Sequence, residues 1–115
     1  MDGVHHIGDG AFCGCENLTH FHIPSGVKIL YDHTFLSCKN LVEISIPSSV
    51  TRIDKGVFEG CKSLKYLSVP ESVKSIGEKA FMLCESLTEI SISQKTEIFE
   101  DIFKYLDKNC KVIRF

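Results

Sequence analysis

The chain has 115 residues, a formal net charge of −2 and 43% hydrophobic residues. That length is enough for one hydrophobic core and too short for two ordinary domains. The slight acidic balance offers no basic surface, so nucleic acid is excluded as a predicted partner. No apolar run reaches the roughly 18 residues of a transmembrane helix, and no signal-peptide pattern opens the chain. We therefore expect no membrane insertion, and the compartment stays unknown from this chain.

A repeat of 23 residues runs through the sequence. The columns in register are Phe12, Phe35, Phe58 and Phe81; Cys15, Cys38, Cys61 and Cys84; Leu18, Leu41, Leu64 and Leu87; Pro24, Pro47 and Pro70. Such a period predicts stacked units, each of which buries its apolar side only against its neighbours. We predict a single domain over residues 1–115. Its units are 1–23, 24–46, 47–69 and 70–92, followed by a divergent C-terminal capping unit, 93–115.

Within a unit the predicted elements follow a fixed order. A proline opens the unit and is followed by a bend and a short extended piece. Next, Ile76, Ala80, Phe81 and Cys84 fall at i, i+4, i+5 and i+8, which indicates a short helix or a pair of tight turns. The unit closes in a strand, where apolar residues alternate with polar ones until the next proline, which cannot donate a ladder hydrogen bond.

The two ends of the chain differ from the middle. Ile98, Phe99, Ile102, Phe103 and Leu106 form an apolar stripe, preceded by acidic and followed by basic residues. This pattern predicts an amphipathic capping helix aligned with its dipole, although a merely degenerate repeat is the alternative. The first unit keeps repeat-type residues from Val4 onward and has no polar cap. We therefore expect a C-terminal fragment of a longer array or, alternatively, a short protein that self-associates through its N-terminal edge.

The cysteines and histidines raise the question of a metal or disulfide site. Four of the six cysteines share one column, so their Cβ vectors run parallel, which favours buried free thiols over disulfides. Cys13 and Cys15, with His5, His6, His20 and His22 nearby in sequence, could suggest zinc, but Cys15 belongs to the thiol column. The thiol column and the strand histidines point in different directions, so no metal and no cofactor are predicted. No nucleophile motif occurs either, so we expect no catalytic residues and no enzyme.

The stretch from Val4 to about Ile92 carries a family resemblance, and units three and four show its pattern. The residues are Leu41, Ile44, Ile46, Pro47, Val50, Ile53, Phe58 and Cys61, then Leu64, Leu67, Val69, Pro70, Val73, Ile76, Phe81 and Cys84. This pattern resembles the BspA-like leucine-rich repeat, with departures in the second unit at Tyr31 and Thr34. The resemblance implies an α/β repeat solenoid: a right-handed coil, five parallel strands on the concave face and short helical turns on the convex side. It also implies non-enzymatic protein–protein or adhesion interactions, and a cell-surface or secreted location.

The outward positions of the strands are the candidate binding site, because solenoids bind along a long face. These positions are His20, His22, Glu43, Ser45, Tyr66, Ser68, Glu89 and Ser91. Tyr66 is the best single anchor, since tyrosine provides contact area at low entropy cost. The predicted partner is another protein or a surface glycan. A structural spacer or a self-assembly element is the alternative function.

Overall fold

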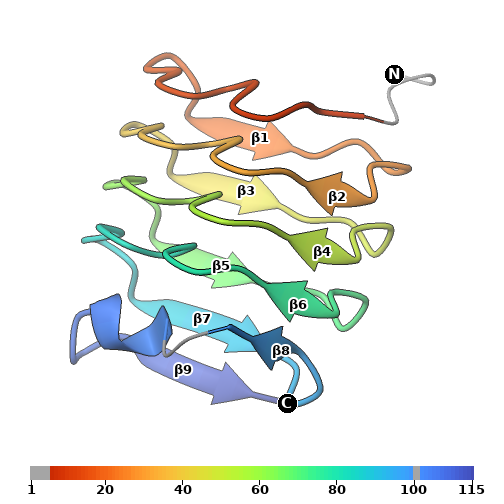
Figure 1. Cartoon of the computed structure of the whole chain (residues 1–115). Helices are drawn as coiled ribbons and strands as arrows, with labels where there is room; N and C mark the ends of the chain where they lie inside the picture. Colours follow the sequence, from red (N-terminus) through yellow and green to blue (C-terminus); the bar gives the residue numbers. More distant parts are fainter. Residues whose placement is uncertain (1–5, 100–101) are drawn as a thin grey trace.

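The computed structural model describes residues 6–99 and 102–115, and the chain winds through them as a stack of coils (Figure 1). One side of the stack carries the longer strands: β1 (His20–His22), β3 (Glu43–Ser45), β5 (Tyr66–Ser68), β7 (Glu89–Ile92) and β9 (Lys111–Arg114). We call its outward side the long-strand face. Parallel pairing joins β1 to β3, and β7 to both β5 and β9. Instead of one five-stranded sheet, the long strands thus form two ladders, interrupted between β3 and β5.

A second parallel sheet follows the first around each coil. It is formed by β2 (Ile29–Leu30), β4 (Arg52–Ile53), β6 (Ser75–Ile76) and β8 (Glu97–Ile98), in that order. We call its outward side the short-strand face. These strands are the short extended pieces that the sequence predicts. Each has an outward residue followed by an apolar one that packs into the core between the sheets and the turns.

The phenylalanine column forms the centre of the core. The ring of Phe35 stacks between Phe12 and Phe58, with centroid distances of 5.4 and 5.8 Å and interplanar angles of 3°. Phe58 continues the stack to Phe81 at 6.5 Å. Phe35, Phe58 and Phe81 are fully buried. Equivalent side chains of successive units therefore lie over one another, which confirms the stacking that the 23-residue period predicts.

The third side of each coil consists of consecutive turns in place of the predicted helical turns. Two columns of residues in these turns have positive φ: Gly10, His33, Gly56 and Lys79, then Gly14, Ser37, Gly60 and Leu83. A left-handed residue cannot continue a right-handed helix. Backbone N–H groups that lie between two left-handed residues donate to the next coil. Between His33 and Ser37, for example, the N–H of Phe35 donates to the carbonyl of Val57 at 3.0 Å. The same bond joins Phe12 to Thr34.

The C-terminal unit departs from the predicted amphipathic helix. Ile98 is taken into strand β8, where it pairs with Ile76, and Phe99 is 76% exposed. The only helical segment among the described residues is the 3-10 helix η1 (Ile102–Tyr105), which buries Ile102 in the core. The prediction of a longer helix was wrong because β6 offers Glu97 and Ile98 a ladder. The expected acidic residues at positions 100 and 101 lie outside the described residues, as do Val4 and His5.

The last long strand is also shifted by one position. Lys111 pairs with Glu89, whereas the 23-residue spacing places Val112 there. The final unit is thus a shorter closure of the stack. Within the part of the chain that the structure describes, no helix is long and apolar enough to cross a membrane.

Candidate functional site: the long-strand face

The structure places all eight predicted site residues on strands β1, β3, β5 and β7. The residues between them, such as Ile44, Leu67 and Ile90, are buried in the core. Successive side chains of a strand point to opposite faces, so the polar residues point outward. Seven of the eight are exposed, and Ser91 is half-buried.

Tyr66 and Glu43 form the central contact of this face. The hydroxyl of Tyr66 donates a hydrogen bond to Oε2 of Glu43, one coil away, at 3.2 Å. The negative charge of Glu43 raises the pKa of Tyr66 above its ordinary value. The ring itself is 52% exposed. The arrangement therefore holds an aromatic surface in one orientation while leaving it open to a partner.

A row of polar side chains runs beside the Tyr66–Glu43 contact: His22, Ser45, Ser68 and Ser91. Nδ1 of His22 lies 2.6 Å from Oγ of Ser45, and the hydroxyl of Ser91 donates to that of Ser68 at 3.4 Å. His20 instead contacts its chain neighbour Thr19, with 3.3 Å between Nδ1 and Oγ1. The row is thus ordered by contacts between adjacent coils, and these hydroxyls can exchange such bonds for bonds to a ligand.

Five of the predicted residues line one shallow groove of about 360 Å³: His22, Glu43, Ser45, Tyr66 and Ser68. Its apolar lining comes from Ile44, Ile46 and Pro70. Both β3 and β5 contribute, so the groove lies where the ladder is interrupted. His20, Glu89 and Ser91 do not line it.

Sequence reasoning did not include Ile46 and Pro70 in the site. Ile46 occupies the last apolar position of its unit, which the repeat pattern predicts to be in the core. Its counterparts Ile23, Val69 and Ile92 are indeed buried. Ile46 is only half-buried. The proline reads as a strand terminator, and its ring at the strand end was a usable signal for an apolar rim.

The cysteine column is chemically separate from this face. All six cysteines are free, and Cys38, Cys61 and Cys84 are buried. The Sγ atom of Cys61 donates to the carbonyl of Phe35 at 3.2 Å, a bond that recurs in the neighbouring coils. Burial raises the pKa of Cys38 to about 11 and that of Cys84 to about 12. These thiols remain neutral at physiological pH and act as small core residues with a weak donor.

The histidines lie apart from that column. Cys13 is exposed on the turns, whereas His20 and His22 are on the long-strand face. Among residues 6–99 and 102–115, no group of three or more His, Cys, Asp or Glu side chains is arranged to hold a metal ion.

Parallel strands on two sides of each coil, with one apolar stack between them, form a parallel-strand β-solenoid, which is consistent with a leucine-rich-repeat coil. The family model described as "BspA type Leucine rich repeat region (6 copies)" matches residues 2–113, so the chain belongs to the BspA-type leucine-rich repeat family. No protein among the curated ones matches the chain.

Two solved structures support the assignment. A leucine-rich repeat protein from Bacteroides ovatus is 34% identical with a TM-score of 0.85, over 97% of this chain. A leucine-rich repeat protein from T. pallidum is 25% identical with a TM-score of 0.61, over 99% of this chain. The chain spans 29% and 65% of the lengths of those two proteins, respectively.

Proposed function

We propose that this chain is a non-enzymatic binding module of the cell surface or of a secreted protein, which contacts another protein or a surface glycan through its long-strand face. The observation that carries the proposal is the groove around Tyr66. An exposed aromatic ring is held by Glu43 and sits beside a row of hydroxyls and an apolar rim at Ile46 and Pro70. Aromatic anchors next to adaptable polar groups are typical of binding surfaces.

Substitution of Tyr66 tests this function without disturbing the core. The chain is immobilised and its binding is measured to a glycan array and to solubilised surface proteins, before and after Tyr66→Ala. We expect Tyr66→Ala to reduce binding by about tenfold or more, and Glu43→Gln to reduce it less. Leu83→Ala is the matched control, because Leu83 is 49% exposed but lies on the turns. Equal losses for Leu83→Ala and Tyr66→Ala would contradict the proposal.

A second candidate function is self-assembly, or a spacer role, through the N-terminal coil. Phe12, Leu18 and Phe21 pack on the core but remain only half-buried, unlike their counterparts in the following coils. Among the residues that the structure describes, strand β1 is paired on one side only. Another repeat or chain that covers this edge would bury these side chains. Light scattering as a function of concentration tests it: a monomer at all concentrations contradicts self-assembly, and a Phe21→Asp variant is expected to dissociate any oligomer.

A further inference from the structure

One interface of the stack lacks the backbone hydrogen bonds that join the long strands elsewhere. It lies between the second and third coils, whose strands β3 and β5 form no ladder, and we call it the seam. After the long strand of the first coil, the N–H of Ile23 donates to the next coil at 3.1 Å, and in the third coil that of Val69 does so at 2.9 Å. Ile46 holds the same position in the second coil and Ser68 is the corresponding acceptor; both are described residues, yet no hydrogen bond joins them. Ile46 is also only half-buried, whereas Ile23 and Val69 are buried.

The backbone contact at the start of the long strands is also longest at the seam. There the N–H of Lys65 lies 3.3 Å from the carbonyl of Val42. The equivalent distance at the next interface, from the N–H of Thr88 to the carbonyl of Lys65, is 2.7 Å. At the preceding interface, from the N–H of Val42 to the carbonyl of Thr19, it is 2.7 Å as well. The backbones are thus joined most weakly at the seam, and their bonds are lost toward the ends of the strands.

The outward side chains repeat this interruption. Hydrogen bonds in the row of polar side chains join β1 to β3 and β5 to β7. Across the seam, in the part of the chain that the structure describes, no hydrogen bond joins Ser45 to Ser68. The contact that does cross it is the one from the hydroxyl of Tyr66 to Oε2 of Glu43, at 3.2 Å. This pair therefore supplies the side-chain hydrogen bond between β3 and β5.

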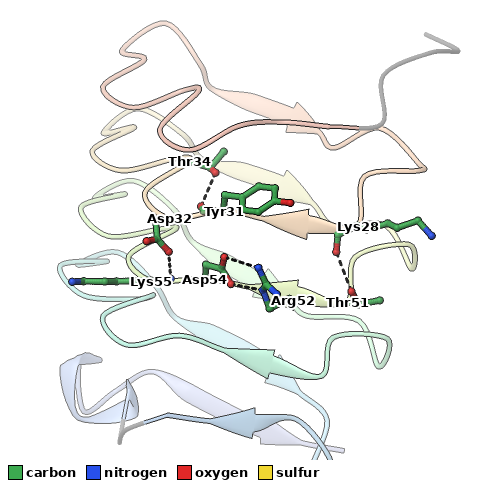
Figure 2. Close-up of polar contacts among 8 residues, drawn as sticks. All are labelled: Lys28, Tyr31, Asp32, Thr34, Thr51, Arg52, Asp54 and Lys55. Atoms are coloured by element: carbon green, nitrogen blue, oxygen red, sulfur yellow. Dashed lines mark hydrogen bonds and ion pairs between the residues drawn. The ribbon is translucent and has the colours of Figure 1, made fainter.

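The other two sides of the coil stay joined at the same interface. On the short-strand face β2 pairs with β4. Beside these strands, the hydroxyl of Thr51 donates to the carbonyl of Lys28 and the backbone N–H of Lys55 to Oδ1 of Asp32, both at 3.2 Å (Figure 2). On the turns, the N–H of Phe35 donates to the third coil at 3.0 Å. A separation of the two coils would thus take place on the long-strand face, with the short-strand face and the turns as the hinge.

We propose that the stack opens at the seam and that the hydrogen bond between Tyr66 and Glu43 is the latch that holds it closed. The net contribution of one hydrogen bond changes an equilibrium by about two- to tenfold, so the latch can be released while the core beneath stays folded. Opening widens the groove around Tyr66, which lies between β3 and β5. A ligand that takes the Tyr66 hydroxyl or the Glu43 carboxylate as its own partner releases the latch. This last step rests on the proposed function, whereas the opening itself does not.

Amide hydrogen exchange of the chain without ligand, followed residue by residue by NMR, tests the proposal. In the wild type we expect the N–H of Ile46 to exchange at least about tenfold faster than that of Val69, each relative to its intrinsic rate. Tyr66→Phe removes only the hydroxyl. We expect it to lower the protection of the Lys65 N–H, which crosses the seam, by about two- to tenfold. The N–H of Thr88, at the next interface, is expected to keep its protection.

Two further variants make the test decisive. Glu43→Ala removes the acceptor of the latch and is expected to act as Tyr66→Phe does. Ser45→Ala is the matched control, because it removes the contact with His22 at an interface whose ladder is intact, and we expect it to leave exchange at the seam unchanged. Equal exchange of the two N–H groups compared in the wild type, or unchanged protection of Lys65 in both latch variants, overturns the proposal. An equal loss of protection at the next interface overturns it too, because the change would then be a general destabilisation. Since no ligand is present, these outcomes are independent of whether the long-strand face binds a partner.

Discussion

Replacement of Phe58 by alanine is the most direct test of the stacked core. The Phe58 ring is fully buried between Phe35 and Phe81, in the middle of the stack. An aromatic side chain buries about 150–250 Å², which at about 25 cal/mol per Å² corresponds to about 4–6 kcal/mol. Measured Phe→Ala substitutions in cores cost about 3–5 kcal/mol, in part because a cavity remains. We therefore expect Phe58→Ala to lower the free energy of unfolding by about 3–5 kcal/mol.

The assay is urea unfolding followed by far-UV circular dichroism, because the chain has no tryptophan to report by fluorescence. At about 4 °C per kcal/mol for a domain of this size, the melting temperature falls by roughly 12–20 °C. Phe99→Ala is the matched control, since the same side-chain deletion at a 76% exposed position is expected to change stability by less than about 0.5 kcal/mol. A loss below about 1 kcal/mol for Phe58→Ala would refute the buried stack.

Three further predictions follow from the same coordinates. Phe12→Ala is expected to cost less than Phe58→Ala in the same urea titration, because Phe12 is only half-buried. Ser37→Gly is expected to raise the free energy of unfolding by about 0.5–1 kcal/mol, since Ser37 has φ 57° and its short, exposed side chain loses little buried area; a loss would contradict the strain. Stability should fall above about pH 9, because thiols of the unfolded chain then ionise while Cys38 and Cys84, whose folded pKa values are about 11 and 12, stay protonated. Melting temperatures at pH 8 and 10.5, with Cys84→Ala as control, check this sign.

The columns of the repeat were predictable because each one meets the same environment in every coil. Leu41, Phe58 and Cys61 repeat with a fixed spacing, and only a structure that superimposes them can bury them together. The outward positions follow from the strand period of two. Thus the core and the orientation of the candidate site residues could be obtained from the pattern alone.

The turns could not be predicted from apolar spacing. Ile76, Ala80, Phe81 and Cys84 fit the stripe of a helix, yet Ile76 ends strand β6 and Ala80 and Phe81 lie in the tight turns that this spacing could not distinguish from a helix. The decisive positions are the left-handed ones, and half of those in the turns are not glycine: His33, Ser37, Lys79 and Leu83. A signal did exist, because Gly10 and Gly56 share one column, and Gly14 and Gly60 the other. Glycine recurring at a fixed position indicates a backbone that must adopt positive φ.

The C-terminal unit shows where tertiary context overrides local pattern. Its apolar stripe is a genuine amphipathic signal, but strand β6 supplies partners that an isolated helix lacks. Pairing of Ile98 with Ile76 buries apolar area and satisfies backbone groups, and this leaves Phe99 outside the core. Helix propensity and apolar periodicity are therefore weak predictors of structure where the strand of a neighbouring coil offers free backbone hydrogen-bonding groups.

This separation between core and surface columns also explains how the outward positions can vary while the fold is kept. The inward columns must be apolar in every coil, so changes there cost several kcal/mol. An outward residue contacts mainly its counterparts one coil away, as Tyr66 contacts Glu43. Ser75 and Gly77, for example, line a groove on the short-strand face, while the phenylalanine stack beneath continues from Phe58 to Phe81. The chemistry of the surface is thus set by individual outward positions, coil by coil, and not by the repeat pattern that identifies the fold.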